Sequence, residues 1–226
     1  MAAVASPTAD HRQKFMKMFD VEHGFADWRD LLQCDLDFVC VTTPPFLHKE
    51  MVEGVLRSGK GVLCEKPFAL SVADATEMAD VATRTPLLAL VDHQLRFHPA
   101  VRHMKQMIDG GEIGKVFEVR AVVNLASRNK TDLPWSWWSD ATRGGGALGA
   151  IGSHLIDLNR YLVGEIAEVS CNLGTSIAHR PDGNGSLLPV TSDDHFAMMM
   201  KFGRSSVALG SSSLMHVTTV GAYTWF

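Results

Sequence analysis

Gly59-Lys60-Gly61-Val62-Leu63-Cys64-Glu65-Lys66-Pro67-Phe68-Ala69-Leu70 contains two different kinds of structure in twelve residues. The apolar run that follows the two glycines is typical of a buried strand in a parallel sheet. Glu65 to Pro67 ends this strand, and the proline favours an extended conformation at Lys66. Open α/β sheets bind ligands outside the carboxyl ends of their strands, so Lys66 is a candidate for binding or catalysis. A solvated lysine in a loop fits the same pattern.

The first half of the chain alternates strand and helix patterns. Apolar runs that predict strands lie at residues 2–6, 37–41, 62–64 and 87–91. Amphipathic runs that predict helices lie at residues 8–19, 46–57, 71–83 and 99–108, with a short one after Asp27. This alternation predicts a doubly wound parallel sheet of the Rossmann type over residues 1–110.

The pattern changes near Gly110. Residues 116–126 alternate as a half-exposed strand does, and further strands are expected at 167–173, 194–202, 205–213 and 217–225. One helix, which follows Gly144-Gly145-Gly146 and runs to about Leu162, interrupts these strands. We therefore expect residues 111–226 to form an α+β domain with an open-faced, mostly antiparallel sheet.

Composition limits the classes of function. The chain of 226 residues is 46% apolar, with a net charge of −4 and no basic stripe, so it has a globular core and no nucleic-acid partner is expected. Its apolar runs are shorter than a membrane span, which favours a soluble, cytoplasmic protein. Four cysteines lack CxxC spacing and ten histidines lack an HExxH pattern, so we expect free, mostly buried thiols and no bound metal.

Three side chains could carry proton transfer. His154 and Asp157 stand three residues apart on a predicted helix, so the carboxylate could orient the imidazole. With Lys66 they supply a base, an orienting group and a cation, which suits removal of a proton from an alcohol as hydride leaves its carbon. A histidine packed on the sheet beside a surface carboxylate fits the His154–Asp157 pattern as well.

A polar loop carries three tryptophans, Trp135, Trp137 and Trp138, which could wall a pocket for a ring-shaped substrate such as a sugar. Core or interface anchors are an equally good interpretation of these rings. Arg96 could place a cation near the same site, or could be a solvated charge before a helix.

Several motifs in this order resemble the glucose–fructose oxidoreductase, inositol dehydrogenase and rhizopine-catabolism (Gfo/Idh/MocA) family. They are Thr42-Thr43-Pro44-Pro45 with His48, the stretch from Gly59 to Pro67, Arg96-Phe97-His98-Pro99, Ile113-Gly114, Gly144-Gly145-Gly146-Ala147-Leu148 and His154-Leu155-Ile156-Asp157. The resemblance implies an NAD(P)-binding Rossmann domain, an open-faced sheet domain and oxidoreduction of a sugar, polyol or related hydroxyl. It also implies a homo-oligomer, because the open sheet of this family often forms a subunit interface.

The resemblance assigns roles to residues of this sequence. Lys66 and His154 are the expected catalytic residues, Lys66 also touching the nicotinamide ribose and His154 accepting the proton. The expected cofactor-binding residues are Ser6, Thr42, Thr43, Pro44, His48, Glu65, Lys66 and Arg96. The expected substrate-binding residues are Trp138, Arg143 and Asp157. Pro7 stands where some members carry an arginine for the 2′-phosphate, which favours NAD over NADP.

The sequence departs from the family pattern in three ways. The usual aspartate four residues before His154 is Ala150 here, and Asp157 does not replace it. Residues 1–6 match the second family strand, and no glycine-rich turn stands between a first strand and a first helix, the glycines at 110–111 and 144–146 being in the wrong context. Family members also continue beyond residue 226. We therefore expect a piece of an oxidoreductase truncated at both ends, with a noncatalytic binding protein or an inactive truncated product as alternatives.

Overall fold

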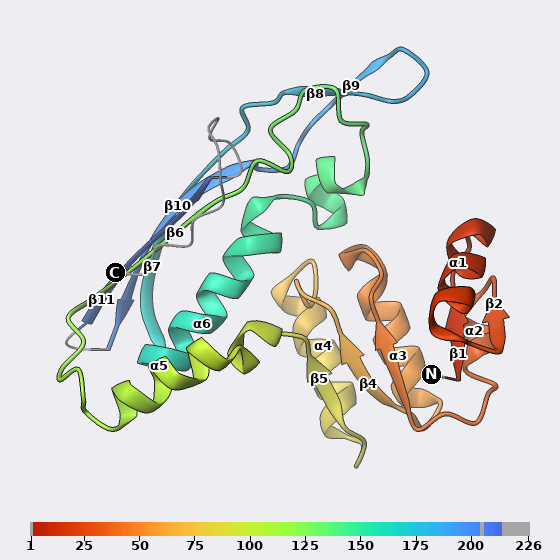
Figure 1. The fold of residues 1–226 in the computed structure, drawn as a ribbon, viewed down its shortest axis with the longest axis horizontal. Helices are drawn as coiled ribbons and strands as arrows, with labels where there is room; N and C mark the ends of the chain where they lie inside the picture. The colour runs from red at the N-terminus through yellow and green to blue at the C-terminus, as the bar shows by residue number, and fades with distance from the viewer. Residues whose placement is uncertain (1, 204–205, 214–226) are drawn as a thin grey trace. The chain divides into compact units, whose positions relative to one another are not determined.

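The computed structural model describes residues 2–203 and 206–213. The chain forms two compact units, Met1–Asp92 and His93–Phe226 (Figure 1). The division falls directly after the third strand of a parallel sheet, earlier than the boundary near Gly110 that the change of pattern suggested. Residues 93–109 therefore group with the second unit, because their helix packs there.

The first unit contains ten elements. They are β1 (Ala3–Ala5), α1 (Ala9–Phe19), β2 (His23–Phe25), α2 (Trp28–Leu31), β3 (Phe38–Val41), η1 (Pro45–Leu47), α3 (His48–Arg57), β4 (Gly61–Cys64), α4 (Val72–Thr83) and β5 (Ala89–Val91). All strand pairs are parallel, in two sheets of order β1-β2 and β3-β4-β5. The parallel sheet and its crossover helices are confirmed. Strand β2 was not predicted, because His23-Gly24-Phe25 is no apolar run.

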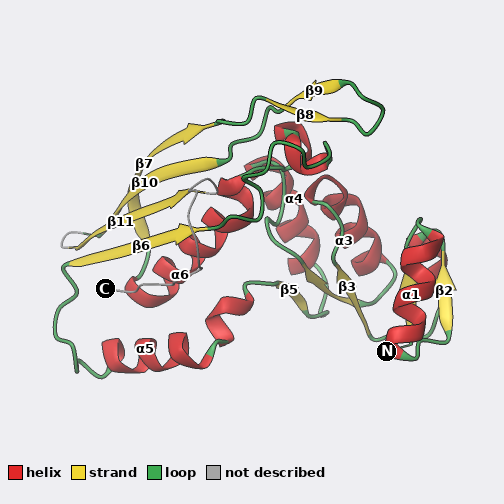
Figure 2. Ribbon diagram, turned by 45° about the horizontal axis from the view of Figure 1, so that its top comes forward, coloured by secondary structure: helices red, strands yellow, loops and turns green. Residues whose placement is uncertain are grey.

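The sheet β3-β4-β5 is covered on one face. Helices α3 and α4 lie beside this sheet (Figure 2). Their apolar side chains form one core with Val41, Val62 and Cys64. On the other face Leu88 and Leu90 are 60% and 46% exposed. The apolar character of these strands predicted burial on both faces, whereas the described residues cover only one.

This one-sided packing corrects the expectation for the thiols. All four cysteines are free, as expected, but Cys40 and Cys171 are exposed and Cys34 is half-buried. Cys64 is fully buried, and burial raises the pKa of its thiol to about 12. An apolar neighbourhood in the sequence therefore did not predict which strand face a cysteine occupies.

The second unit begins with η2 (Gln94–Phe97) and α5 (Pro99–Asp109), where Pro99 is the first helical residue as predicted. The remaining elements are β6 (Glu118–Asn124), η3 (Trp137–Ser139), η4 (Ala141–Arg143), the π-helical turn η5 (Leu148–Gly152), α6 (Ser153–Val163), β7 (Ile166–Gly174), β8 (His179–Pro181), β9 (Leu187–Pro189), β10 (His195–Phe202) and β11 (Ser206–Ser213). The hairpin β8–β9 was not predicted. The strand expected at 217–225 lies outside the described residues.

The sheet of the second unit has the order β6-β11-β10-β7. Strand β10 is antiparallel to both neighbours, whereas β11 and β6 are parallel. Helix α6 lies on one face, where Leu155 packs with Phe196, Met198 and Met200 (Figure 1). The mostly antiparallel, open-faced sheet expected from the alternating pattern is confirmed.

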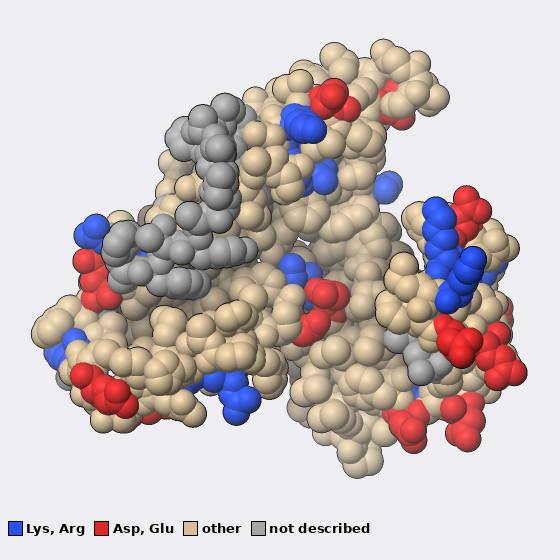
Figure 3. Space-filling model, viewed as in Figure 1, with Lys and Arg blue, Asp and Glu red and all other residues tan. Residues whose placement is uncertain are grey.

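Charged side chains of both signs are interspersed over the visible surface (Figure 3). No helix among the described residues combines the length and the apolar character that a membrane crossing requires.

Candidate functional site

In the first unit, the candidate residues gather around the loop at the end of β4. Strand β4 ends at Cys64, and the Glu65 amide donates to the Val41 carbonyl of β3 at 2.9 Å, so the pairing of β3 and β4 extends into the loop. The Glu65 carboxylate accepts the Lys66 amide at 3.1 Å, and the peptide bond from Lys66 to Pro67 is cis. Lys66 therefore sits at the carboxyl end of a parallel strand, as the sequence predicted.

Three of the expected cofactor residues lie in the loop after β3, and a fourth, His48, begins α3. Thr42 is exposed, whereas Thr43 and Pro44 are half-buried. His48 is fully buried, and its ring bonds backbone carbonyls of Thr43, Pro67 and Phe68. Ser6 follows β1, and its amide donates to the Phe25 carbonyl at 3.0 Å. The structure thus brings the two loops around Thr43 and Lys66 together through His48.

In the second unit, the candidate residues lie at the start of α6. His154 is 8% exposed, and the ring of His93 meets it edge-on with ring centroids 5.9 Å apart. Asp157, one turn along the helix, is 7% exposed. Two histidines and a carboxylate therefore share one buried region of this unit.

Asp157 is engaged by Arg96. The Arg96 Nε donates to Asp157 Oδ2 at 2.7 Å and its Nη2 to Oδ1 at 2.5 Å, a bidentate ion pair that raises the pKa of Arg96. The Tyr161 ring lies 5.3 Å from the Arg96 guanidinium carbon, and His93 Nδ1 lies 3.9 Å from Asp157 Oδ2. The sequence suggested a cofactor contact for Arg96 and a substrate contact for Asp157, whereas the structure pairs these two residues with each other.

Sequence reasoning missed His93. It directly follows Asp92 at the end of the strand pattern, whereas the motif that drew attention to this segment begins only at Arg96. Its position at the carboxyl end of a parallel strand was a signal of the same kind as that of Lys66.

The turn before α6 holds Ala150. Ala150 is 7% exposed and lies in the π-helical turn that leads into the helix. Asp193 anchors this turn, since its carboxylate accepts the Leu148 amide at 2.7 Å and its carbonyl accepts the Ala147 amide at 3.0 Å. Burial raises the pKa of Asp193, against the effect of these backbone bonds. π-helical turns are frequent at functional sites.

The glycines before this turn are structural. A Cβ atom on Gly145 would overlap the backbone of Trp138, and one on Gly146 would overlap the Asp193 carboxylate. We expected no GxGxxG pattern from the sequence, but Gly144 to Gly149 match it; they stand before a π-helical turn in the second unit and follow no strand directly. The pattern GxGxxG indicates a dinucleotide-binding turn only where it directly follows a strand, so these glycines do not form one.

The tryptophans act as anchors in this structure. The Trp135 indole donates to the Pro189 carbonyl at 2.9 Å, which fixes the loop to β9. Trp138 packs against the core of the second unit, and the Arg128 guanidinium lies 4.9 Å from its ring. Arg143 lies 6.0 Å from the Trp135 ring and 3.5 Å from the Asp140 carboxylate. Of the two interpretations left open, these contacts favour core and loop anchoring.

The groups at the ends of β3 and β4 suit a dinucleotide. The exposed Thr42 hydroxyl, the Glu65 carboxylate and the Lys66 ammonium offer donors and acceptors for ribose hydroxyls at one edge of a parallel sheet. In the part of the chain that the structure describes, no group of three or more His, Cys, Asp or Glu side chains could hold a metal ion.

Family models match both parts of the chain. Residues 1–93 match the model described as oxidoreductase family, NAD-binding Rossmann fold, and residues 101–222 match the GFO/IDH/MocA C-terminal domain. Among solved structures, levoglucosan dehydrogenase in complex with NADH and L-sorbose is similar with a TM-score of 0.88 and 30% identity, over 94% of this chain and 57% of that chain. An oxidoreductase domain protein from Kribbella flavida is similar with a TM-score of 0.86 and 32% identity, over 93% of this chain and 57% of that chain.

Curated relatives agree. Levoglucosan dehydrogenase of Pseudarthrobacter phenanthrenivorans is 32% identical over 206 residues, which is 84% of this chain and 53% of the relative. An uncharacterized oxidoreductase of Synechocystis is 32% identical over 185 residues, 80% of this chain and 50% of the relative. The chain thus spans about half the length of the curated relatives it matches. Matches across both of its parts show that this chain belongs to the Gfo/Idh/MocA oxidoreductase family.

Proposed function

We propose that the protein carrying this chain is an NAD(P)-dependent oxidoreductase that acts on a sugar, polyol or related hydroxyl by hydride transfer. The main support is the structural similarity, over 94% of the chain, to a levoglucosan dehydrogenase in complex with NADH and L-sorbose. Two further observations support this proposal: Lys66 lies at the end of a parallel strand, as expected, and His154 is buried. A nicotinamide dinucleotide would supply the hydride acceptor.

Each residue has a proposed task. Lys66 hydrogen-bonds the reacting hydroxyl and stabilises negative charge that develops on its oxygen. His154 accepts the hydroxyl proton, and its burial holds the ring in one orientation. By the family roles, the dinucleotide is lined by Ser6, Thr42, Thr43, Pro44 and Glu65. The family roles also place Arg143 and Trp138 at the border of the substrate, although Trp138 packs against the core of its unit.

A cofactor titration of the 226-residue chain tests the proposal first. NADH and NADPH fluorescence, followed together with thermal unfolding, should show saturable binding and a cooperative transition. Tighter binding of NADH would agree with Pro7 at the position next to Ser6. Absence of binding here would assign dinucleotide binding to a longer chain that includes the glycine-rich turn, and absence of binding by that longer chain as well would contradict the proposal.

Replacing Lys66 tests the mechanism. With levoglucosan, L-sorbose and a panel of polyols as substrates, Lys66→Ala should lower kcat by about 100-fold or more, because a positioned cation or proton donor contributes on that order. Lys60→Ala is the matched control, since Lys60 stands just before β4 at the opposite end of the same strand. Equal turnover in Lys66→Ala and the control would refute the role of Lys66.

Ala150 favours a second candidate function, a noncatalytic member that binds a nucleotide or sugar. The buried methyl group of Ala150 supplies no carboxylate one turn before His154. Ala150→Asp distinguishes the two. If the scaffold lacks only this group, the variant should turn over a polyol at least about tenfold faster. Intact dinucleotide binding with no turnover in either form would favour the binding role.

We also propose a homo-oligomer that uses the sheet face opposite α6, where Val122 and Met199 are 50% and 51% exposed.

A further inference from the structure

His48 holds the loop that contains Lys66. Its Nε2 lies 2.8 Å from the Thr43 carbonyl, in the loop after β3. Its Nδ1 lies 3.0 Å from the Pro67 carbonyl and 3.3 Å from the Phe68 carbonyl, in the loop after β4. One ring therefore bridges the ends of two adjacent parallel strands, directly after Lys66.

All three partners of the His48 ring are hydrogen-bond acceptors. A backbone carbonyl only accepts hydrogen bonds, so a ring nitrogen bonds its loop only where it carries a hydrogen: the neutral ring donates to one of the two loops, and the imidazolium donates to both. The ring is 0% exposed, so water does not replace a lost donor, and an unpaired buried carbonyl costs more than the bond contributed. Both nitrogens lie within hydrogen-bond distance of protein carbonyls, which leaves neither to bond a cofactor.

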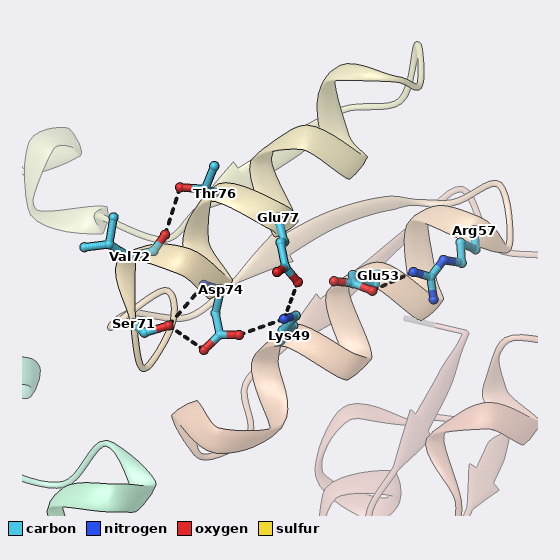
Figure 4. Close-up of polar contacts among 8 residues, drawn as sticks. All are labelled: Lys49, Glu53, Arg57, Ser71, Val72, Asp74, Thr76 and Glu77. Carbon is cyan, nitrogen blue, oxygen red and sulfur yellow. Dashed lines mark hydrogen bonds and ion pairs between the residues drawn. The ribbon is translucent and has the colours of Figure 1, made fainter.

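Lys49, the next residue of α3, holds the other end of the same loop. Its ammonium donates to Asp74 at 2.7 Å and also to Glu77, both on α4 (Figure 4). The Asp74 carboxylate in turn accepts the Ser71 hydroxyl at 2.7 Å, and Ser71 caps α4. These bonds raise the pKa of Lys49, the bond to Asp74 contributing most.

Apolar packing completes the attachment. Phe68 and Ala69 pack against the core that α3, α4 and the sheet β3-β4-β5 share. Residues 66–71 are thus held at the Pro67–Phe68 carbonyls, at the Phe68 side chain and at the cap of α4. Lys66 is the first residue of this fixed segment.

We propose that the first turn of α3 is a positioning device for Lys66, in which His48 fixes the start of the loop and Lys49 its end. The inference rests on the proposed role of Lys66 in the reaction. It reassigns His48 from the cofactor contact that the sequence suggested to a positioning residue that acts through the backbone.

Hydrogen–deuterium exchange tests the attachment without cofactor or substrate. In the 226-residue chain, amides of residues 65–71 should exchange at least about tenfold faster in His48→Phe, which keeps an aromatic ring but no donor. His48→Gln, whose amide still donates to one loop, should give an intermediate rate. His103→Asn, a change of an exposed histidine on α5, is the control.

Kinetics then separate positioning from cofactor contact. A positioning role predicts that His48→Phe lowers kcat about tenfold or more while the KM for NADH or NAD+ changes less than about threefold, with partial recovery in His48→Gln. Unchanged exchange at residues 65–71, or a loss confined to dinucleotide affinity, would overturn the proposal.

Two further results keep the test decisive. If His48→Phe does not fold, Lys49→Met should still speed exchange at the first turn of α4, and no change there would count against the device. The protein without substitutions could show no dinucleotide binding, even as the longer chain with the glycine-rich turn, while the variants show the expected faster amide exchange. In that case the attachment of the Lys66 loop stands and the proposed function fails.

Discussion

Asp157 and Arg96 form an ion pair beside His154, the proposed proton acceptor. The Asp157 side chain is 8% exposed and that of Arg96 is 39% exposed, so the pair is only partly shielded from water. The bidentate geometry is nevertheless of the strong kind. The pair ties η2 to α6, between which His93 and His154 meet.

At this residue scale we expect Asp157→Asn to lower the free energy of unfolding by about 1–3 kcal/mol. The variant loses two charge-assisted bonds and leaves the Arg96 guanidinium without its counter-charge, and the loss is smaller than for a fully buried pair because Arg96 is partly exposed. Urea unfolding measures this change. Glu165→Gln, which removes the exposed partner of Arg160, is the control and should have little effect. Equal losses in both variants would show that burial of Asp157 contributes nothing.

The turn before α6 is bonded to Asp193, which lies just before β10. Gly146 has φ +117°, and a side chain there would collide with the Asp193 carboxylate that caps the turn. Gly183, in the β8–β9 hairpin, has φ +87°, and a Cβ atom added there would meet no atom within 4 Å. The two glycines share a positive φ but differ in contacts.

We therefore expect Gly146→Ala to be destabilised by about 2 kcal/mol more than Gly183→Ala, because strain at positive φ costs about 1–3 kcal/mol in each and the collision adds to it only at Gly146. Thermal or urea unfolding of the two variants measures the difference. Equal stability would mean that Asp193 moves aside at no cost, and that the turn is not fixed by it.

At the scale of the whole molecule, the open face of the second sheet carries, among the described residues, two exposed apolar side chains beside charged ones, which form the ion pairs Arg120–Glu118 and Lys201–Glu168. Val122 and Met199 stand on the face of the second sheet opposite α6, because their neighbours Ala121, Met198 and Met200 are buried against the helix side. Exposed apolar side chains on an open sheet mark interaction surfaces in soluble proteins.

At this scale we expect the chain, of 24.7 kDa, to sediment as a reversible oligomer. Met199→Glu should weaken association at least about tenfold, because a carboxylate would be buried at the interface without a partner. Met18→Glu, at a 73% exposed methionine of α1, is the matched control. Sedimentation velocity that shows a monomer for the unchanged chain, or the same association for both variants, would contradict this expectation.

Local patterns determined much of the fold. Apolar runs indicated the central parallel strands, and the side chains of Ser71 and Asp27 cap the helices that follow them. Strands β2, β8 and β9 escaped this reasoning, whereas β1 and β5, which are also three residues long, lie within the predicted apolar runs 2–6 and 87–91. The three missed strands form because neighbouring strands supply their hydrogen bonds.

The sequence by itself determined the strand-end position of Lys66, the helical position of His154, and the family to which both belong, because these depend on local pattern and on ordered motifs. Only the tertiary structure decided that His48 is buried against backbone carbonyls, that Arg96 engages Asp157, and that His93 meets His154. Arg96 and Asp157 stand 61 residues apart in the chain, and long-range packing, not local periodicity, brings such partners together. The same reason explains Cys40, whose exposure depends on which sheet face the helices cover.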